Sequence, residues 1–144
     1  MILCDVGVLL SAMMAHSPHH EVCRKPLDTL RAGGAPHAVS ELILAAVVRI
    51  ATNPKVWRPA ATASEAFAFV ELLRADRHAV IVAPGALHWK IFRGLVMDAG
   101  IRGADTTDAY LAALAIEHGC EWWTIDGGFS RFAKLRRRNL LAVG

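Results

Sequence analysis

The chain opens with Met1-Ile2-Leu3-Cys4-Asp5-Val6-Gly7-Val8-Leu9-Leu10, an apolar run that is interrupted by one carboxylate. Residues 1–4 predict a short buried strand and residues 6–14 predict a helix, so Asp5 falls on the turn between them. A carboxylate in such surroundings must cap the helix, bind a cation or lose much of its solvation free energy. Asp5 is therefore the first candidate for a functional residue.

Short apolar strands alternate with helices along the rest of the chain. The predicted strands are residues 1–4, 36–39, 79–83 and 121–125, with a possible edge strand at 140–143. The predicted helices are residues 6–14, 21–31, 41–50, 62–74, 87–98 and 106–118. This alternation favours an α/β fold with a parallel sheet and helices on both faces, and 144 residues fit a single domain, 1–144.

The composition limits the compartment and the class of partner. The chain has three well-separated cysteines, no Cys-x-x-Cys spacing and no uninterrupted apolar run of about 18 residues, which favours a reducing, cytoplasmic location without a membrane span. Its net charge is +3, and basic residues gather near the end of the chain as Arg131, Lys134, Arg136, Arg137 and Arg138. That run favours a polyanionic partner, although a solvated helix end would carry the same pattern.

Four acids accompany the predicted strand ends. Asp5 follows the first strand, Glu41 the second and Asp126 the fourth, while Asp108 lies in the first turn of the helix that leads into the fourth strand. Because ligands of open parallel sheets bind at the carboxyl ends of the strands, we expect these four to form one acidic site. Such a cluster suits Mg²⁺ and metal-assisted hydrolysis of phosphodiesters, and Thr124 is placed to hydrogen-bond one of the carboxylates or a bound water.

Each acid also has a simpler interpretation. Asp5, Glu41 and Asp108 stand where helices begin, and carboxylates there accept hydrogen bonds from free amides and meet the positive end of the helix dipole. Asp126 fits an ordinary turn. Only their joint position at one end of the predicted sheet separates a site from a set of caps.

Segments around these acids carry a resemblance to a known family. They are, in chain order, Leu3-Cys4-Asp5-Val6-Gly7-Val8-Leu9-Leu10, Ser40-Glu41-Leu42, Asp108-Ala109-Tyr110-Leu111-Ala112-Ala113-Leu114-Ala115 and Thr124-Ile125-Asp126-Gly127-Gly128-Phe129. They resemble the successive signatures of PIN-domain ribonucleases, and the match is greatest to VapC toxins of type II toxin–antitoxin systems.

The resemblance implies a three-layer α/β/α sandwich, Mg²⁺ or Mn²⁺ in an acidic pocket, endonucleolytic cleavage of RNA, a homodimer, and inhibition by a VapB-type antitoxin. It assigns metal binding and catalysis to Asp5, Glu41, Asp108 and Asp126, with Asp105 as a weaker candidate beside Asp108. Two positions depart from the family pattern. Gly7 stands in place of an Asn and Gly128 in place of a second Asp, and both changes affect the residues that support the metal ligands.

Basic side chains outside the acidic cluster are candidates for contacts with RNA phosphates. These are Arg93, Arg102, Arg136 and Arg137, which would equally suit an ordinary solvated surface. Two other functions stay open at this point. One is a PIN-like module that binds RNA or a protein without cutting, as the two glycines suggest; the other is a phosphatase or phospho-acceptor domain, which also places Asp after the first strand.

Overall fold

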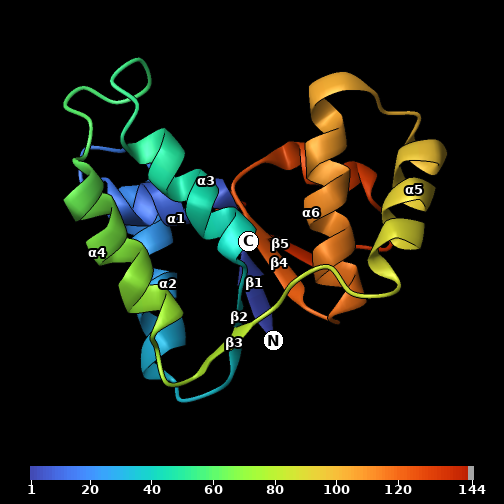
Figure 1. Ribbon diagram of the computed structural model, residues 1–144, viewed down its shortest axis with the longest axis horizontal. Helices are drawn as coiled ribbons and strands as arrows, with labels where there is room; N and C mark the ends of the chain where they lie inside the picture. The colour runs from blue at the N-terminus through green and yellow to red at the C-terminus, as the bar shows by residue number, and fades with distance from the viewer. Residues whose placement is uncertain (143–144) are drawn as a thin grey trace.

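Parallel strand pairing organises the fold, of which the computed structural model describes residues 1–142 (Figure 1). The strands are β1 (Ile2–Cys4), β2 (His37–Val39), β3 (Ala79–Ile81), β4 (Glu121–Thr124) and β5 (Arg137–Asn139). Hydrogen bonds join them as β1-β4-β5 and as β2-β3, and β2 lies beside β1. The predicted parallel sheet is therefore present, with its hydrogen bonding divided between two parts.

Helices cover both sides of these strands. They are α1 (Val6–Met13), α2 (His20–Ala32), α3 (Glu41–Ala51), α4 (Ala63–Arg74), α5 (His88–Ala99) and α6 (Thr106–Glu117), with short 3₁₀ turns η1 (Gly103–Asp105) and η2 (Gly127–Arg131). Figure 1 shows α1 to α4 gathered on one side and α5 with α6 on the other. Since α1 packs on α2 and α3, α3 on α4, and α5 on α6, the α/β/α sandwich is confirmed.

Local sequence signals set the helix ends as predicted. Ser40 caps α3 by accepting a hydrogen bond from the amide of Ile43 at 3.3 Å. Thr62 and Glu65 form a reciprocal capping box at the start of α4. Gly100, with φ of 61°, ends α5 in the left-handed conformation that favours glycine. The start of α3, the start of α4 and the end of α5 are therefore each set by nearby residues.

The edge strand differs from its prediction. It was expected at residues 140–143, of which residue 143 lies outside the described residues, whereas β5 is Arg137–Asn139. The amide of Trp122 donates to the carbonyl of Arg136 at 2.8 Å, and the amide of Leu140 donates to the carbonyl of Thr124 at 2.9 Å. Backbone pairing with β4 therefore sets the position of β5, and an exposed edge strand does not need apolar side chains.

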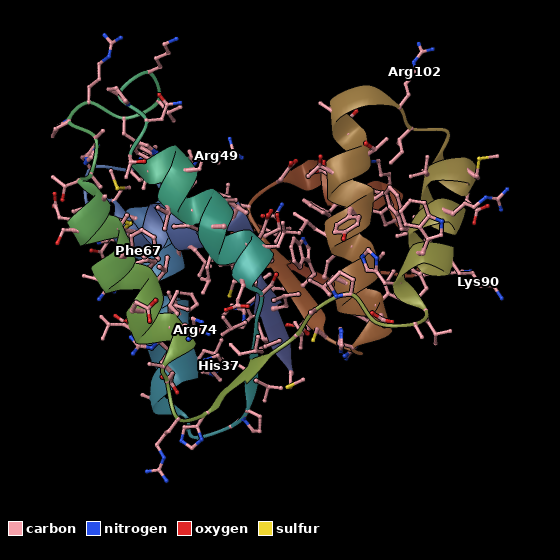
Figure 2. All side chains as sticks on the ribbon, in the orientation of Figure 1. His37, Arg49, Phe67, Arg74, Lys90 and Arg102 are labelled. Atoms are coloured by element: carbon pink, nitrogen blue, oxygen red, sulfur yellow. The ribbon has the colours of Figure 1, made fainter. Side chains whose placement is uncertain are left out.

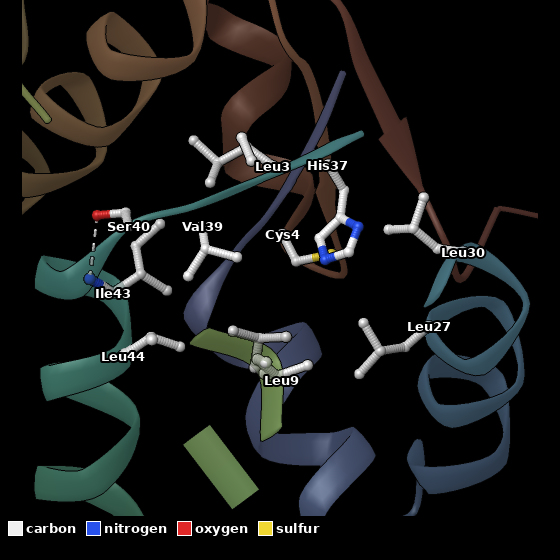
Figure 3. Close-up of a pocket in the computed structure, with 12 residues that line it drawn as sticks. Leu3, Cys4, Leu9, Leu27, Leu30, His37, Val39, Ser40, Ile43 and Leu44 are labelled. Carbon is white, nitrogen blue, oxygen red and sulfur yellow. Dashed lines mark hydrogen bonds between the residues drawn. The ribbon is translucent and has the colours of Figure 1, made fainter. Parts of the chain in front are cut away.

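The core is tightly filled around α6 and β1. The middle of α6 is buried except for Tyr110, which is half-buried, and its alanines allow neighbouring elements to approach closely. A small cavity of about 20 Å³ lies between β1, β2 and the helices α1 to α3, and the ring of His37 borders it (Figure 3). That volume is roughly what a single water molecule occupies. Both ring nitrogens of His37 lack a hydrogen-bond partner within residues 1–142, and burial lowers its pKa.

Candidate functional site

Asp5 is the best-held carboxylate of the predicted site. It is only 8% exposed and caps α1, where its Oδ1 accepts a hydrogen bond from the amide of Val6 at 2.7 Å. Its Oδ2 accepts a second hydrogen bond, also 2.7 Å, from the hydroxyl of the fully buried Thr124 on β4. The hydrogen bond predicted for Thr124 is thus present. Asp5 is a helix cap, and it is also oriented by a side chain from the far end of the sequence.

Thr124 links Asp5 to Asp126. The same hydroxyl oxygen accepts a hydrogen bond from the amide of Asp126 at 3.0 Å. Asp126 in turn accepts a hydrogen bond from the amide of Gly128 at 2.8 Å and so begins η2. One buried hydroxyl therefore fixes the strand-end positions of two of the four predicted acids.

Asp108 reaches the same region from the first turn of α6. Its Oδ2 accepts a hydrogen bond at 2.9 Å from Nη2 of Arg131, which lies at the end of η2, and both side chains are about 30% exposed. The guanidinium of Arg131 also lies over the ring of Phe132, at 5.1 Å from its centroid. A cation that the sequence did not single out therefore neutralises one of the predicted ligands.

The pKa values show that these carboxylates affect one another. Burial raises the pKa of Asp5 to about 6; the hydrogen bonds from Thr124 and Val6 oppose this rise, and the negative charges of Asp108 and Asp126 add to it. Burial also raises the pKa of Asp108, although Arg131 counteracts the effect. Asp5, Asp108 and Asp126 therefore share one region of negative potential, as expected for a cation site.

The other two predicted acids stand apart from this trio. Glu41 occupies the first turn of α3, with its side chain 60% exposed, and its Oε2 pairs with Nε of Arg74 on α4 at 2.9 Å. Asp105 is exposed just before α6, and its negative charge contributes to the raised pKa of Asp108. Neither side chain contacts Asp5 in the structure.

The candidate RNA-binding arginines do not converge. Figure 2 shows Arg102 beyond the end of α6 that carries Asp108, whereas Arg93 projects from α5. Arg136 donates to the carbonyl of Gly119 at 2.8 Å, at the opposite end of β4 from Asp126, and Arg137 is exposed on β5. Of the four, only Arg102 is at the acidic end of the fold.

The donor set suits a hard divalent cation. Carboxylate oxygens are the ligands that Mg²⁺ prefers, and each oxygen of Asp5 keeps a lone pair beyond its single hydrogen bond. Within the described part of the chain, however, no three His, Cys, Asp or Glu side chains are close enough together to hold a metal as they stand. The trio thus fits the metal by chemical type, with Asp108 drawn toward Arg131.

Sequence reasoning missed Arg131 as a member of this site. It belongs to the run of basic residues near the end of the chain, and none of the motifs around the four acids includes it. Its position directly after the acidic turn at Asp126 is the signal that would have found it, since a cation close behind a carboxylate cluster is a natural counter-charge.

Comparisons with known proteins agree with this architecture. The PIN domain family profile matches residues 2–135. Ribonuclease VapC25 of Mycobacterium tuberculosis is 37% identical over 94% of this chain and 96% of its own length, and ribonuclease VapC31 of the same organism is 38% identical with the same coverage.

Solved structures share the fold. VapBC2 from Rickettsia felis, bound to a DNA fragment from its promoter, superposes with a TM-score of 0.70 at 15% identity, covering 96% of this chain and 98% of that one. M. tuberculosis VapC20, described as a toxin that cleaves the sarcin–ricin loop, gives a TM-score of 0.66 at 17% identity, with 90% and 93% covered. Together with the acidic strand ends, the profile match and the identities to VapC ribonucleases establish that this chain belongs to the PIN domain family, among its VapC-type members.

Proposed function

We propose that this protein is a divalent-metal-dependent endoribonuclease that acts as the toxin of a toxin–antitoxin pair. The observation that carries the proposal is the buried Asp5, held by two hydrogen bonds and facing the charges of Asp108 and Asp126. A buried carboxylate that is surrounded by like charges is costly unless a cation or a proton compensates it. The VapC relatives are named as ribonucleases, which supports RNA as the substrate.

In the proposed site, Asp5, Asp108 and Asp126 hold Mg²⁺ or Mn²⁺, and Glu41 contributes from α3. When bound, such a cation lowers the pKa of a water ligand and stabilises negative charge on phosphoryl oxygens. The residues of this chain supply orientation: Thr124 hydrogen-bonds to the carboxylate of Asp5 and to the backbone amide of Asp126, so it fixes the Asp5 carboxylate relative to the strand end that carries Asp126.

The partners that follow are an RNA substrate, a small VapB-type antitoxin and a second copy of the chain, in a cytoplasmic setting. The structural relatives named VapBC support the antitoxin. No helix within residues 1–142 is long and apolar enough to cross a membrane. A short reading frame directly upstream, encoding a DNA-binding N-terminus and an amphipathic C-terminus, would be the matching genetic arrangement.

Cleavage of RNA by the purified chain tests the proposal. Bacterial total RNA is incubated with the protein and Mg²⁺ or Mn²⁺, with and without excess chelator, and fragments are mapped by primer extension. Discrete cuts that the chelator abolishes are expected, and Asp5→Asn should slow them on the order of 100-fold or more. No cutting with either metal, or equal cutting by Asp5→Asn, would refute the nuclease.

One rival function has structural support. Two of the four predicted acids, Glu41 and Asp108, already have an arginine partner, which suits a PIN module that binds RNA without cutting. Such a module should bind RNA equally well with and without divalent metal. Binding measured by fluorescence polarisation, with and without chelator, separates it from the nuclease.

A further inference from the structure

Arg131 occupies a position inside the acidic site, and its contacts there are incomplete. Its Nη2 holds Asp108 at 2.9 Å, yet its buried Nε has no hydrogen-bond partner within residues 1–142. An N–H that is removed from water without a partner loses the free energy of a hydrogen bond. If the guanidinium swung outward, Nε would return to solvent, whereas the ion pair with Asp108 and the contact with the ring of Phe132 hold the guanidinium where it is.

Gly128 provides the space for this arrangement. A Cβ at position 128 would lie 3.4 Å from Nη1 of Arg131 and 3.1 Å from Oδ1 of Asp126. The contact with Asp126 is tighter than an ordinary van der Waals contact and the one with Arg131 is at its lower limit, so a side chain there would shift the carboxylate and crowd the guanidinium. The glycine that departs from the family pattern therefore coincides with an internal cation lying beside the carboxylates.

The charges make the guanidinium and a divalent metal rivals. Three carboxylates share the region, and Arg131 hydrogen-bonds to one of them, Asp108. An oxygen of Asp108 that turns toward a metal weakens its hydrogen bond to Nη2, and the metal repels the guanidinium. The two cations are thus alternative partners of the same carboxylate.

We propose that Arg131 is an internal counter-cation that competes with the divalent metal for Asp108, so that metal loading requires the guanidinium to release this carboxylate. The inference rests on the proposed function in one respect, namely that the acids bind a divalent cation. It adds a residue that lowers metal affinity and offsets one negative charge of the metal-free site.

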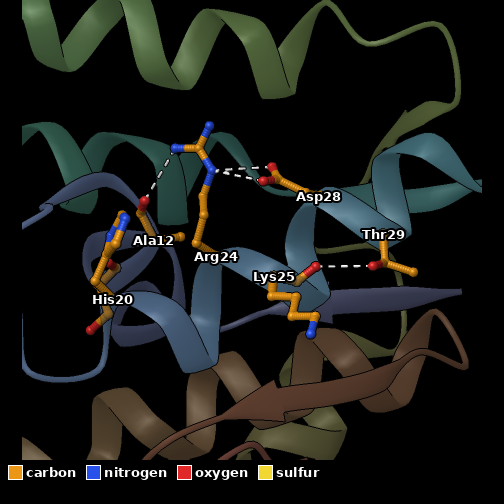
Figure 4. A network of polar contacts seen from close by, with 7 residues as sticks. Ala12, His20, Arg24, Lys25, Asp28 and Thr29 are labelled. Carbon is orange, nitrogen blue, oxygen red and sulfur yellow. Dashed lines mark hydrogen bonds and ion pairs between the residues drawn. The ribbon is translucent and has the colours of Figure 1, made fainter.

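Metal affinity, measured without RNA, tests the proposal. Mn²⁺ binding to the chelator-stripped chain is followed by calorimetry for the wild type, Arg131→Gln, Arg24→Gln and Asp5→Asn. Arg24 is the matched control because it also pairs with an aspartate, Asp28 at 3.1 Å, on the surface of α2 (Figure 4). Arg131→Gln should bind Mn²⁺ about fivefold more tightly or better, as expected for loss of a partly exposed ion pair, while Arg24→Gln should bind as the wild type does.

A second measurement follows Arg131 itself, so it does not require a substitution at that position. In the ¹⁵N spectrum of arginine side chains, the Nε–H signal of Arg131 should shift on addition of Mg²⁺ to the wild type and stay fixed in Asp5→Asn. Thermal melting of each variant checks folding.

The outcomes separate the two proposals. Unchanged or weaker Mn²⁺ binding by Arg131→Gln, with binding still lost in Asp5→Asn, overturns the role of Arg131 and leaves the metal site standing. No Mn²⁺ binding by any of the chains overturns both. Tighter binding by Arg131→Gln and Arg24→Gln alike also overturns the specific competition, because general loss of positive charge would then explain it.

Discussion

Replacing Asp5 by asparagine should make the metal-free protein more stable at neutral and alkaline pH. Asparagine can keep the contact with Val6, whose amide donates to Oδ1, and can reverse the contact with Thr124, whose hydroxyl would accept from Nδ2 and no longer donate to residue 5. The substitution therefore removes mainly a buried negative charge that lies near two others. Catalytic residues commonly show such a conflict between stability and function.

The magnitude follows from the pKa of Asp5, about 6 against an ordinary 3.8. Because the folded chain binds this proton more tightly than the unfolded chain, the free energy of unfolding decreases as pH rises from about 4 to about 6. Above that range the free energy of unfolding decreases no further. Because the two pKa values differ by about two units, the total decrease is about 3 kcal/mol. Asp5→Asn should be free of this loss, which corresponds to a melting temperature roughly 10 °C higher at pH 8 and to little difference below pH 4.

Urea unfolding followed by circular dichroism, at several pH values between 4 and 8 and with chelator present, measures the effect. Asp28→Asn is the control, because it neutralises an exposed aspartate in a surface ion pair and should change stability by less than about 1 kcal/mol. If the difference in the free energy of unfolding between Asp5→Asn and the wild type did not increase with pH, burial would not raise the pKa of Asp5.

Three further substitutions test individual contacts. Thr124→Val removes the hydroxyl shared by two acids and should cost about 2 kcal/mol in urea unfolding, with Thr124→Ser restoring most of it; equal stability of the two variants would contradict this. Thr62→Ala removes a capping-box hydroxyl and should cost about 1 kcal/mol, so a change near zero would speak against the cap. Glu41→Gln breaks an exposed pair with Arg74 and should change stability by less than about 1 kcal/mol while slowing RNA cleavage roughly 10-fold or more. Unchanged cleavage would remove Glu41 from the site.

Local signals in the sequence predicted the helix ends because their causes are local. The Ser40 cap, the Thr62 capping box and the Gly100 terminus each depend on residues within one helical turn. The predicted position of the edge strand was wrong because backbone hydrogen bonds to β4 set the position of β5. The side chains of β5 contribute little to that pairing.

The same distinction applies to the site. The hydrogen bond from Thr124 to Asp5 could be predicted, since both residues lie at the carboxyl ends of adjacent parallel strands. The partners of Asp108 and Glu41 could not, because Arg131 and Arg74 reach them from elements whose packing the sequence pattern does not specify. The sequence positions of the acids predicted them as candidates, whereas their arginine partners could be identified only in the folded structure.

The hydroxyl of Thr124 also bears on when the proposed site forms during protein synthesis. It joins Asp5, which follows β1, to the backbone of Asp126, so these two residues have no fixed relation until β4 has left the ribosome. A nascent chain that ends before β4 contains Asp5 and Glu41 but lacks the hydroxyl that orients Asp5. A nuclease of this construction could thus not attack the RNA around it before β4 had been made and had paired with β1.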